Sequence, residues 1–364
     1  MDHEKTDLTD LSREELAAFF RDLGEKPFRA GQVMKWLFNY GVADFEQMTN
    51  LSKDLRSRLV EIAAIGRLKA LKVEESSDGT VKFLWSLSDG AAMESVLMPQ
   101  AGHYTLCVSS QVGCAMGCRF CRTGTLGLRR NLRPGEIIGQ FLQARASLAD
   151  KSRLTNLVFM GMGEPLANRA NVVRALKILT EPGLAGLSRR RLSLSTVGLI
   201  PELPLLSNEV ALGLTVSLNA ADDQTRDYLM PINRRYPLAA LHDALAAYPL
   251  PHGRRITIAY VLLAGVNDST RDAVNLAKYL HGLKVKVNLI PFNSFPGSEF
   301  EAPDEAAVEA FQEILVKKNF TTMIRQSKGR DISGACGQLA GGREDGASGD
   351  QGQGPGPSAV RRPL

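Results

Sequence analysis

The sequence predicts an α/β protein: a partial (β/α)6 barrel, preceded by a small N-terminal α+β domain and followed by a disordered tail. Short apolar, β-branched runs alternate with amphipathic segments of helical period between residues 94 and 340. The 364 residues suffice for two domains, and residues 341–364 hold almost nothing apolar. We therefore divide the chain into an accessory domain (1–93), a core (94–340) and a tail (341–364).

The first 93 residues predict three helices and a hairpin. Ser12, followed three residues later by Glu15, has the spacing of a capping box at the start of the first helix. A second helix is centred on Trp36, and a third begins after Leu51. Two β-rich runs within residues 68–87 are separated by Ser-Asp-Gly, which is typical of a hairpin turn. Basic side chains make this domain a candidate to touch RNA phosphates, or simply a solvated face.

The core predicts six strands in sequence order: 104–110, 154–159, 191–195, 210–218, 255–262 and 285–290. Amphipathic segments lie between them, such as 134–149, which Pro134 opens at the first helical position. Such alternation implies a parallel sheet with helices outside, and ligands of parallel sheets bind at the carboxyl ends of the strands. Residues at or just after these strand ends are therefore candidate site residues.

A loop after the first core strand holds Cys114, Cys118 and Cys121, three of the chain's five cysteines. A cubane iron–sulfur cluster normally takes four Cys ligands, so three would leave one iron open to another ligand. Gly113 and Gly117 allow the backbone to turn tightly between the thiols. Zinc or plain buried thiols are the alternatives, but zinc favours paired C-x-x-C units and no second pair exists. The loop therefore predicts a 4Fe–4S cluster.

The two other cysteines are far apart in sequence. Cys107 lies in the strand before the cysteine loop, and Cys336 lies in a Gly-rich segment near the end of the core. Gly334 and Gly337 favour an exposed, mobile loop around Cys336, which suits a reactive thiol. From the residues alone, a functional pair, two inert buried thiols and a structural disulfide all stay open, the last disfavoured in the cytosol.

Several motifs, taken together and in order, resemble the radical S-adenosylmethionine (SAM) RNA methyltransferases of the RlmN/Cfr family. They comprise the segments 26–36, 106–114, 131–140, 160–165 and 289–293 and the Cys336 loop. The resemblance runs from about residue 10 to about residue 340. It implies a radical SAM barrel, a 4Fe–4S cluster on the three loop cysteines, and SAM as the second cofactor.

The resemblance also implies roles for residues outside the cysteine loop. The expected SAM contacts are Gly163, Glu164, Ser195, Ser217, Leu218, Asn219 and Asn293. Many family members have His where this chain has Asn219, so a side-chain contact there is less secure than a backbone one. Glu94 matches a carboxylate that is a candidate proton acceptor beside the substrate adenine; the alternative is a surface Glu at a strand start.

The mechanism implied by the resemblance consumes two SAM molecules. The first methylates the Cys336 thiolate, and the second, bound to the cluster, is cleaved to a deoxyadenosyl radical that removes hydrogen from the new methyl group. The resulting methylene radical adds to an adenine ring carbon. After proton loss, Cys107 attacks the Cys336 sulfur, forms a transient disulfide and releases methylated RNA.

The expected substrates are one adenosine of 23S rRNA near the peptidyl transferase centre and the adenosine 3′ of certain tRNA anticodons, both methylated at carbon 2. Arginines around the cysteine loop are candidates for the RNA entrance: Arg119, Arg122, Arg129, Arg130 and Arg133, and with lower priority 189–191 and 254–255. A flavodoxin or ferredoxin is the expected electron donor, and a monomer is the default.

Charge and hydropathy are compatible with a cytoplasmic RNA enzyme. The net charge is +5 and the isoelectric point about 8.9, which permits nucleic-acid binding. No apolar stretch reaches the roughly 18 residues of a membrane span, and the charged N-terminus lacks an apolar signal region.

Two further hypotheses remain open at this level. A Cfr-like enzyme would methylate carbon 8 of the same rRNA adenosine with the same cysteines; the long N-terminal region and segment 26–36 favour carbon 2. A non-enzymatic RNA-binding protein with a structural metal centre would leave Cys336 without a role.

Overall fold

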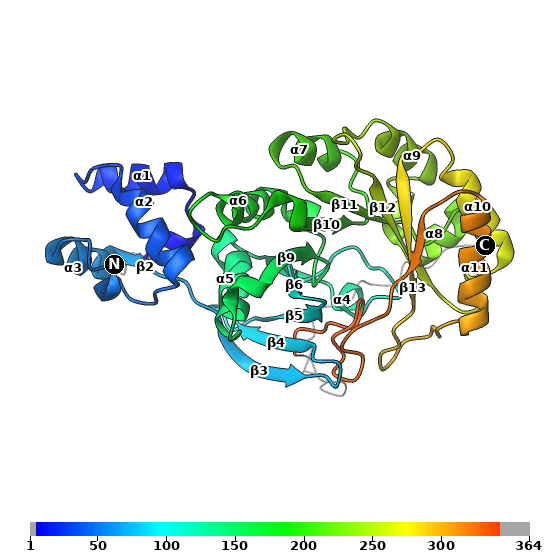
Figure 1. Ribbon diagram of the computed structural model, residues 1–364, viewed down its shortest axis with the longest axis horizontal. Coiled ribbons are helices and arrows are strands. Elements are labelled where there is room, and N and C mark those ends of the chain that lie inside the picture. Colours follow the sequence, from blue (N-terminus) through cyan, green and yellow to red (C-terminus); the bar gives the residue numbers. More distant parts are fainter. Residues whose placement is uncertain (1–4, 343–364) are drawn as a thin grey trace, which may run out of the picture.

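One mixed ten-stranded sheet organises the protein (Figure 1). The structure, a computed structural model, describes residues 5–342. The strand order is β14-β13-β12-β11-β10-β9-β6-β5-β4-β3. The strands are β3 (Lys69–Glu75), β4 (Val81–Ser86), β5 (Ala92–Gln100), β6 (His103–Val108), β9 (Leu154–Phe159), β10 (Leu192–Thr196), β11 (Gly213–Ser217), β12 (Ile256–Leu262), β13 (Val285–Pro291) and β14 (Thr322–Ile324).

The six predicted core strands are confirmed, and they run parallel to one another from β6 through β13. A seventh parallel strand, β14, extends this series at one edge and was not predicted from the sequence. The sheet ends at β14 on one side and β3 on the other, so it does not close, as expected of a partial barrel.

Helices cover the outer face of the parallel strands, as the alternating pattern predicts. They are α5 (Pro134–Ala146), α6 (Arg169–Thr180), α7 (Glu202–Glu209), α8 (Asp223–Leu229), α9 (Leu238–Ala246), α10 (Thr270–Tyr279) and α11 (Glu305–Lys317). Pro134 does occupy the first turn of α5, but the helix ends at Ala146, three residues before the predicted end. Its Ile137, Ile138 and Phe141 are buried in the main core.

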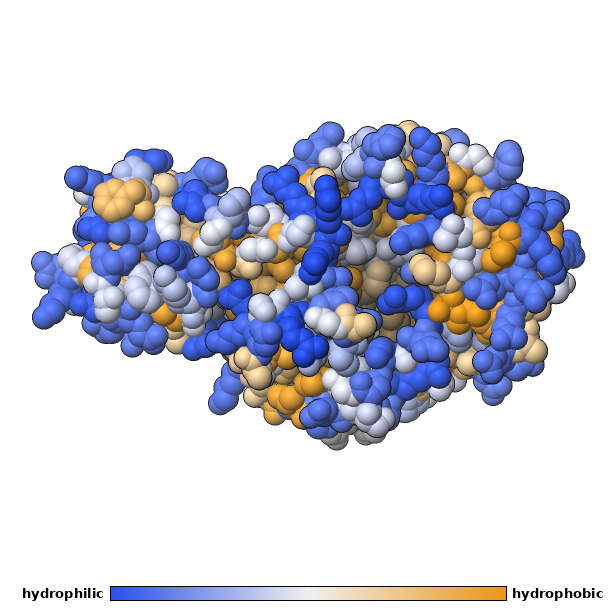
Figure 2. Space-filling view, in the orientation of Figure 1, coloured by the Kyte–Doolittle hydropathy of each residue, from blue (hydrophilic) through white to orange (hydrophobic). Residues whose placement is uncertain are grey.

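The N-terminal lobe contains α1 (Arg13–Asp22), α2 (Arg29–Met34), a π-helical turn (Lys35–Tyr40) and α3 (Lys53–Ile62), with a two-stranded parallel sheet of β1 (Thr6–Asp7) and β2 (Ala63–Ala64). The predicted capping box is present at the start of α1: Glu15 N–H donates to Ser12 Oγ at 3.2 Å, and Ser12 N–H to Glu15 Oε2 at 2.8 Å. Hydrophilic side chains cover much of the face of this lobe and of the core shown in Figure 2.

The predicted hairpin, β3–β4, is part of the central sheet. β4 pairs antiparallel with β5, which pairs with β6, so hydrogen bonds cross the proposed domain boundary at residue 93. That residues 1–93 form a domain separate from residues 94–340 stays a prediction. The predicted disordered tail lies outside the described residues except for its first two positions. Within residues 5–342, no helix is both long and apolar enough to cross a membrane.

Candidate active site

The three loop cysteines lie between β7 (Gln111–Gly113) and the short helix α4 (Arg122–Thr125). Gly113 has φ of +76°, and a Cβ there would stand 1.9 Å from the Gly127 carbonyl oxygen, so only glycine fits. Cys114 N–H donates to that same oxygen at 2.9 Å. The tight turn predicted around the cysteines is thus present and is fixed by backbone contact.

The thiols of this loop influence one another. Burial, with a smaller contribution from neighbouring thiols, raises the pKa of Cys114 to about 12 and that of Cys118 well above its usual range. Within residues 5–342, no three His, Cys, Asp or Glu side chains converge closely enough to hold a single metal ion. A cubane binds each thiolate through a different iron, so its ligands stand farther apart than those of one ion. Three neighbouring thiols on one loop fit such a cluster.

The Cys336 segment lies directly against the cysteine loop. Arg122 N–H donates to the Gly337 carbonyl at 2.8 Å, and Thr123 Oγ1 donates to the Leu339 carbonyl at 2.7 Å. Gly337 has φ of +86°, and a Cβ there would stand 3.3 Å from the Phe120 carbonyl oxygen. Two stretches more than two hundred residues apart therefore form one surface, with Cys336 exposed on it.

The two remaining cysteines lie near enough for the charge of Cys336 to act on Cys107. Cys107 is buried near the end of β6, where it is paired between Val96 of β5 and Val158 of β9. Burial raises the pKa of Cys107, and the nearby Cys336 raises it further. Residue Cys336 as a whole is exposed, yet the surrounding protein desolvates its thiol and raises its pKa, against the lowering effect of Arg325. All five cysteines are free, so a standing disulfide bond is not supported.

Glu164, expected to face the SAM amino group, is buried and already hydrogen-bonded. Its Oε1 accepts from Leu166 N–H at 3.0 Å and its Oε2 from Val197 N–H at 2.9 Å, which joins the ends of β9 and β10. Burial raises the pKa of this carboxyl to about 7. The adjacent Gly163 has φ of +97°, and a Cβ there would meet the Gln111 side chain at 2.5 Å. The absence of a side chain at Gly163 therefore makes room for Gln111 of the protein.

The other expected SAM contacts follow neighbouring strand ends. Ser195 Oγ lies 3.4 Å from Ser217 Oγ across β10 and β11. Leu218 is buried, and its N–H donates to the Ala259 carbonyl at 3.0 Å. Asn219, at φ of +59°, is 1% exposed. Its Oδ1 accepts from Val261 N–H at 2.7 Å. Because the Asn219 side chain is engaged with the backbone of β12, a backbone contact with a ligand is the better expectation there.

Two expected site residues hold the Cys336 segment. Asn293 Nδ2 donates to the Cys336 carbonyl at 3.1 Å. Glu94 is 5% exposed, so it is not a surface residue. Its Oε2 accepts from Ala340 N–H at 2.7 Å and from Gly341 N–H at 2.8 Å, and Lys82 Nζ lies 3.6 Å from its Oε1.

Sequence reasoning missed the residues that anchor this region from a distance. Asp331 Oδ1 accepts from Ser76 Oγ at 2.6 Å, and Asp78 Oδ2 accepts from Gly329 N–H at 3.1 Å. The turn of the β3–β4 hairpin therefore holds the start of the Cys336 segment. A separation of about 250 residues within each pair left no local signal for either contact.

Arg226 of α8 was also missed, because a single arginine on an amphipathic helix has the pattern of a solvated residue. It is fully buried and donates to the carbonyls of Val197 at 3.0 Å and Leu218 at 3.1 Å. It also donates to Asn233 Oδ1 at 2.8 Å. Its guanidinium thus fastens the strand ends where SAM contacts are expected.

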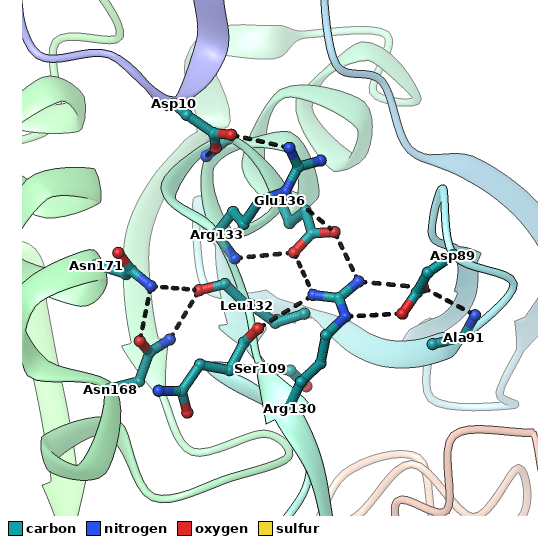
Figure 3. A network of polar contacts seen from close by, with 12 residues as sticks. Asp10, Asp89, Ala91, Ser109, Arg130, Leu132, Arg133, Glu136, Asn168 and Asn171 are labelled. Carbon is teal, nitrogen blue, oxygen red and sulfur yellow. Dashed lines mark hydrogen bonds and ion pairs between the residues drawn. The ribbon is translucent and has the colours of Figure 1, made fainter. Parts of the chain in front are cut away.

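Three of the arginines expected at an RNA entrance form ion pairs with carboxylates of the protein. Arg130 donates to both Asp89 and Glu136, and Arg133 to Asp10, in the network of Figure 3. That network fixes the strand after the cysteine loop and joins the N-terminal lobe to α5. Arg119 lies over the Tyr228 ring at 4.1 Å and pairs with Glu299 at 2.6 Å. The side chains of Arg119 and Arg133 are 42% and 44% exposed, against 27% for Arg130, so Arg119 and Arg133 stay candidates for RNA contact.

Comparisons with known proteins agree with this geometry. Residues 6–65 match the family described as ribosomal RNA large subunit methyltransferase N-terminal domain, and residues 108–277 match the radical SAM superfamily. The chain is 52% identical to the dual-specificity RNA methyltransferase RlmN of Desulfosudis oleivorans, over 92% of this chain and 90% of that protein. It is 49% identical to the same enzyme of Anaeromyxobacter dehalogenans, over 93% of each.

A solved structure is similar over nearly the whole chain. It is a radical SAM methyltransferase from Sphaerobacter thermophilus, with a TM-score of 0.88 and 40% identity, covering 92% of this chain and 99% of the other. The N-terminal lobe, the parallel strands and the cysteine loop are thus parts of one known architecture. The chain belongs to the RlmN family of radical SAM RNA methyltransferases, which use SAM and a 4Fe–4S cluster.

Proposed function

We propose that this enzyme methylates carbon 2 of one adenosine of 23S rRNA near the peptidyl transferase centre, and of the adenosine 3′ of the anticodon in tRNAs. The relatives' name, dual-specificity RNA methyltransferase, supports two RNA substrates. The observation that carries the chemistry is that the segment of Cys336 packs against the cysteine loop, with Cys107 nearby. An ordinary methyl displacement does not suit this carbon, because an adenine C–H carbon is a poor nucleophile.

In this proposal Cys336 carries the methyl group. As a thiolate it takes the methyl from a first SAM by polar displacement and becomes S-methylcysteine. The positive charge of Arg325 favours the thiolate, against the desolvation that raises the Cys336 pKa. The contacts of Arg122 and Thr123 with the segment keep this sulfur beside the cysteine loop.

Cys114, Cys118 and Cys121 would hold the cluster, and a second SAM bound there would supply the radical chemistry that removes one hydrogen from the methyl group on Cys336. Cys336 then presents a carbon radical to the adenine ring and becomes joined to carbon 2 through a methylene bridge. Gly163, Ser195, Ser217, Asn219 and the backbone around Leu218 line the strand ends where SAM would lie. Glu164 and Arg226 keep those ends in register through backbone contacts.

Two residues complete the turnover. Glu94 takes the proton that leaves carbon 2, and its hydrogen bonds to Ala340 and Gly341 place it beside the Cys336 segment. The adduct radical also gives up one electron, which the cluster that supplied the first electron would take back. Cys107, as a thiolate, then attacks the Cys336 sulfur. The bond from this sulfur to the methylene carbon breaks, its electron pair and one proton complete the methyl group on the RNA, and the two sulfurs stay joined until a two-electron reductant separates them. We place this chemistry in the cytoplasm, in a monomer that receives electrons from a flavodoxin or ferredoxin.

The test is nucleoside mass spectrometry on unmethylated 23S rRNA fragment and tRNA after anaerobic incubation with enzyme, reductant and SAM. The proposal expects 2-methyladenosine in both RNAs from the wild type and none from Cys336→Ala. If 8-methyladenosine forms instead, the Cfr-like alternative replaces the proposal. If 2-methyladenosine forms with Cys336→Ala, the methyl-carrier role of Cys336 is wrong.

A further inference from the structure

A groove separates the N-terminal lobe from the core. Its larger part, about 870 Å³, is lined from the lobe and its connection to β3 by residues including Tyr40 and Arg67, and from the core by residues including Arg190. A second hollow of about 440 Å³ adjoins it. The two share Ser152, Thr155 and Arg191 in their linings, so together they form one continuous groove.

The charge of this groove has one sign. Among the described residues that line either hollow, there is no Asp or Glu, whereas five are Arg or Lys in the larger hollow alone: Arg67, Arg145, Lys151, Arg190 and Arg191. Arg145 is engaged, since its guanidinium donates to the Phe38 carbonyl at 3.0 Å. The other four are exposed. Elsewhere on this protein arginines form ion pairs with carboxylates, as Arg130 and Arg169 do. A set of basic side chains with no carboxylate among the groove's described lining residues is therefore unusual for this protein.

The groove lies away from the cysteine loop. Lys151 and Ser152 directly precede β9, and Arg190 and Arg191 directly precede β10, so these residues stand at the amino ends of the parallel strands. The cysteine loop and the expected SAM contacts follow the carboxyl ends of the same sheet. The 189–191 run therefore does not line the entrance to the active site, which corrects the expectation drawn from sequence.

We propose that this groove binds the sugar–phosphate backbone of the RNA substrate, at a point remote from the base that is methylated. The proposal rests on the proposed function in one respect, that the substrate is RNA. Cations spread along an open groove between two lobes match successive phosphates better than one small anion. Tyr40, 56% exposed at the rim, offers a ring on which an unpaired base can stack.

Such a groove suits an enzyme with two different RNA substrates. Contacts with phosphates position an RNA without reading its sequence, whereas contacts with base edges select one sequence. A remote, sequence-neutral anchor adds affinity for both RNAs and leaves the selection of the adenosine to the active site. The groove is built from both parts of the protein: Tyr40 belongs to the N-terminal lobe, Arg67 to the connection from the lobe to β3, and Lys151, Arg190 and Arg191 to the core.

The experiment compares two triple variants with equal loss of charge. The first, Arg67→Ala/Arg190→Ala/Arg191→Ala, empties the groove of three exposed cations. The control, Arg271→Ala/Lys278→Ala/Lys318→Ala, removes three exposed cations on α10 and at the end of α11, none of which lines the groove. Fluorescence anisotropy measures Kd for full-length tRNA and for a short hairpin with only the target loop, over a series of salt concentrations. Thermal melting verifies that each variant is folded.

The proposal expects the groove variant to bind full-length tRNA about tenfold or more weakly, with a salt slope smaller by roughly 2 to 3. Binding of the short hairpin, and kcat at saturating tRNA, stay at wild-type values. The control variant behaves as the wild type towards both RNAs. Inorganic phosphate at equal ionic strength does not compete; competition at low phosphate would identify a small-anion site and overturn the proposal.

Two other results would also overturn it. The groove and control variants could lose affinity equally, which would mean that net charge alone matters, or the groove variant could bind tRNA as tightly as the wild type. The binding assay is independent of methylation. If the groove variant binds tRNA more weakly but the wild-type enzyme forms no 2-methyladenosine, the groove proposal stands and the proposed function is rejected.

Discussion

The side chain of Asn293 donates a hydrogen bond to the backbone oxygen of Cys336 at 3.1 Å. This contact links the end of the parallel sheet to the segment that carries the Cys336 thiol, and the same asparagine is an expected SAM contact. Its other polar atom, Oδ1, accepts from Arg330 Nε at 3.1 Å. One side chain therefore fastens the Cys336 segment to the end of the parallel sheet at two points.

We predict that Asn293→Ala loosens the Cys336 segment even without SAM. One net hydrogen bond contributes about 1 kcal/mol, so alkylation of Cys336 should accelerate on the order of fivefold. Peptide mass spectrometry after timed iodoacetamide treatment measures this rate. Asn288→Ala is the matched control, because Asn288 lies in β13, the strand that Asn293 follows by two residues, and its side chain forms no hydrogen bond with the Cys336 segment within residues 5–342. Equal rates in the wild type and Asn293→Ala would show that this contact does not restrain the thiol.

Glu94 has two proposed tasks that substitutions can separate. Glu94→Gln keeps an oxygen that accepts from Ala340 and Gly341 but is a far weaker base, so we predict a near-normal melting temperature and a turnover lower by about 10²-fold or more. Glu94→Ala leaves two backbone donors unpaired and should also lower the free energy of unfolding by about 1–3 kcal/mol. Calorimetry and single-turnover assays test this pair. Full turnover in Glu94→Gln would leave Glu94 only its anchoring task.

Acid should release the hairpin anchor of the Cys336 segment. Burial acts to raise the pKa of Asp78, but hydrogen bonds from Thr80 and Gly329 outweigh it and lower this pKa to about 2. A carboxyl whose pKa is lower in the folded state stabilises the fold above its unfolded value, near 3.8, and loses this contribution as pH falls towards 2. The melting temperature of the wild type should exceed that of Asp78→Asn at pH above 4, with the gap closing as pH falls through this window. A gap independent of pH would contradict the assignment.

We expect Arg226 to contribute to the free energy of unfolding, in addition to holding the strand ends where SAM contacts are expected. It is fully buried and its donors satisfy strand-end carbonyls of Val197 and Leu218, so Arg226→Met leaves these acceptors unpaired. We predict a loss of about 3 kcal/mol in the free energy of urea unfolding, and a smaller loss for Arg226→Lys. The exposed neighbour Arg234 supplies the control, Arg234→Met, expected to be near neutral. Equal stability of Arg226→Met and Arg234→Met would refute the role of the buried guanidinium.

Local patterns explain what could be predicted from the sequence. The six strands have short β-branched runs, and the capping box of Ser12 and Glu15 has fixed spacing. The cysteine loop is recognisable because its three cysteines lie within eight consecutive residues. The three-residue β14 is too short to give a periodic signal. The hairpin is correctly placed in sequence, but its pairing with β5 depends on the whole sheet.

Contacts between residues far apart in the sequence explain which features could not be predicted from it. Asp78 and Asp331 act on partners about 250 residues away, and the groove requires two lobes to be placed side by side. Glu164 and Asn219 were expected to present polar groups to a ligand, but burial turned their side chains towards backbone donors of the protein. Residue type and strand position placed these residues at the site without revealing which partner each would choose.

The most direct test of the central claim, that Cys336 carries the methyl carbon to RNA and Cys107 releases it, uses Cys107→Ala. After anaerobic incubation with SAM, reductant and substrate RNA, denaturing electrophoresis should show a covalent protein–RNA adduct, and tandem mass spectrometry should place it on Cys336 through one methylene carbon. The adduct should be absent from the double variant Cys107→Ala/Cys336→Ala. Free 2-methyladenosine released by Cys107→Ala at the wild-type rate, with no adduct, would contradict the account.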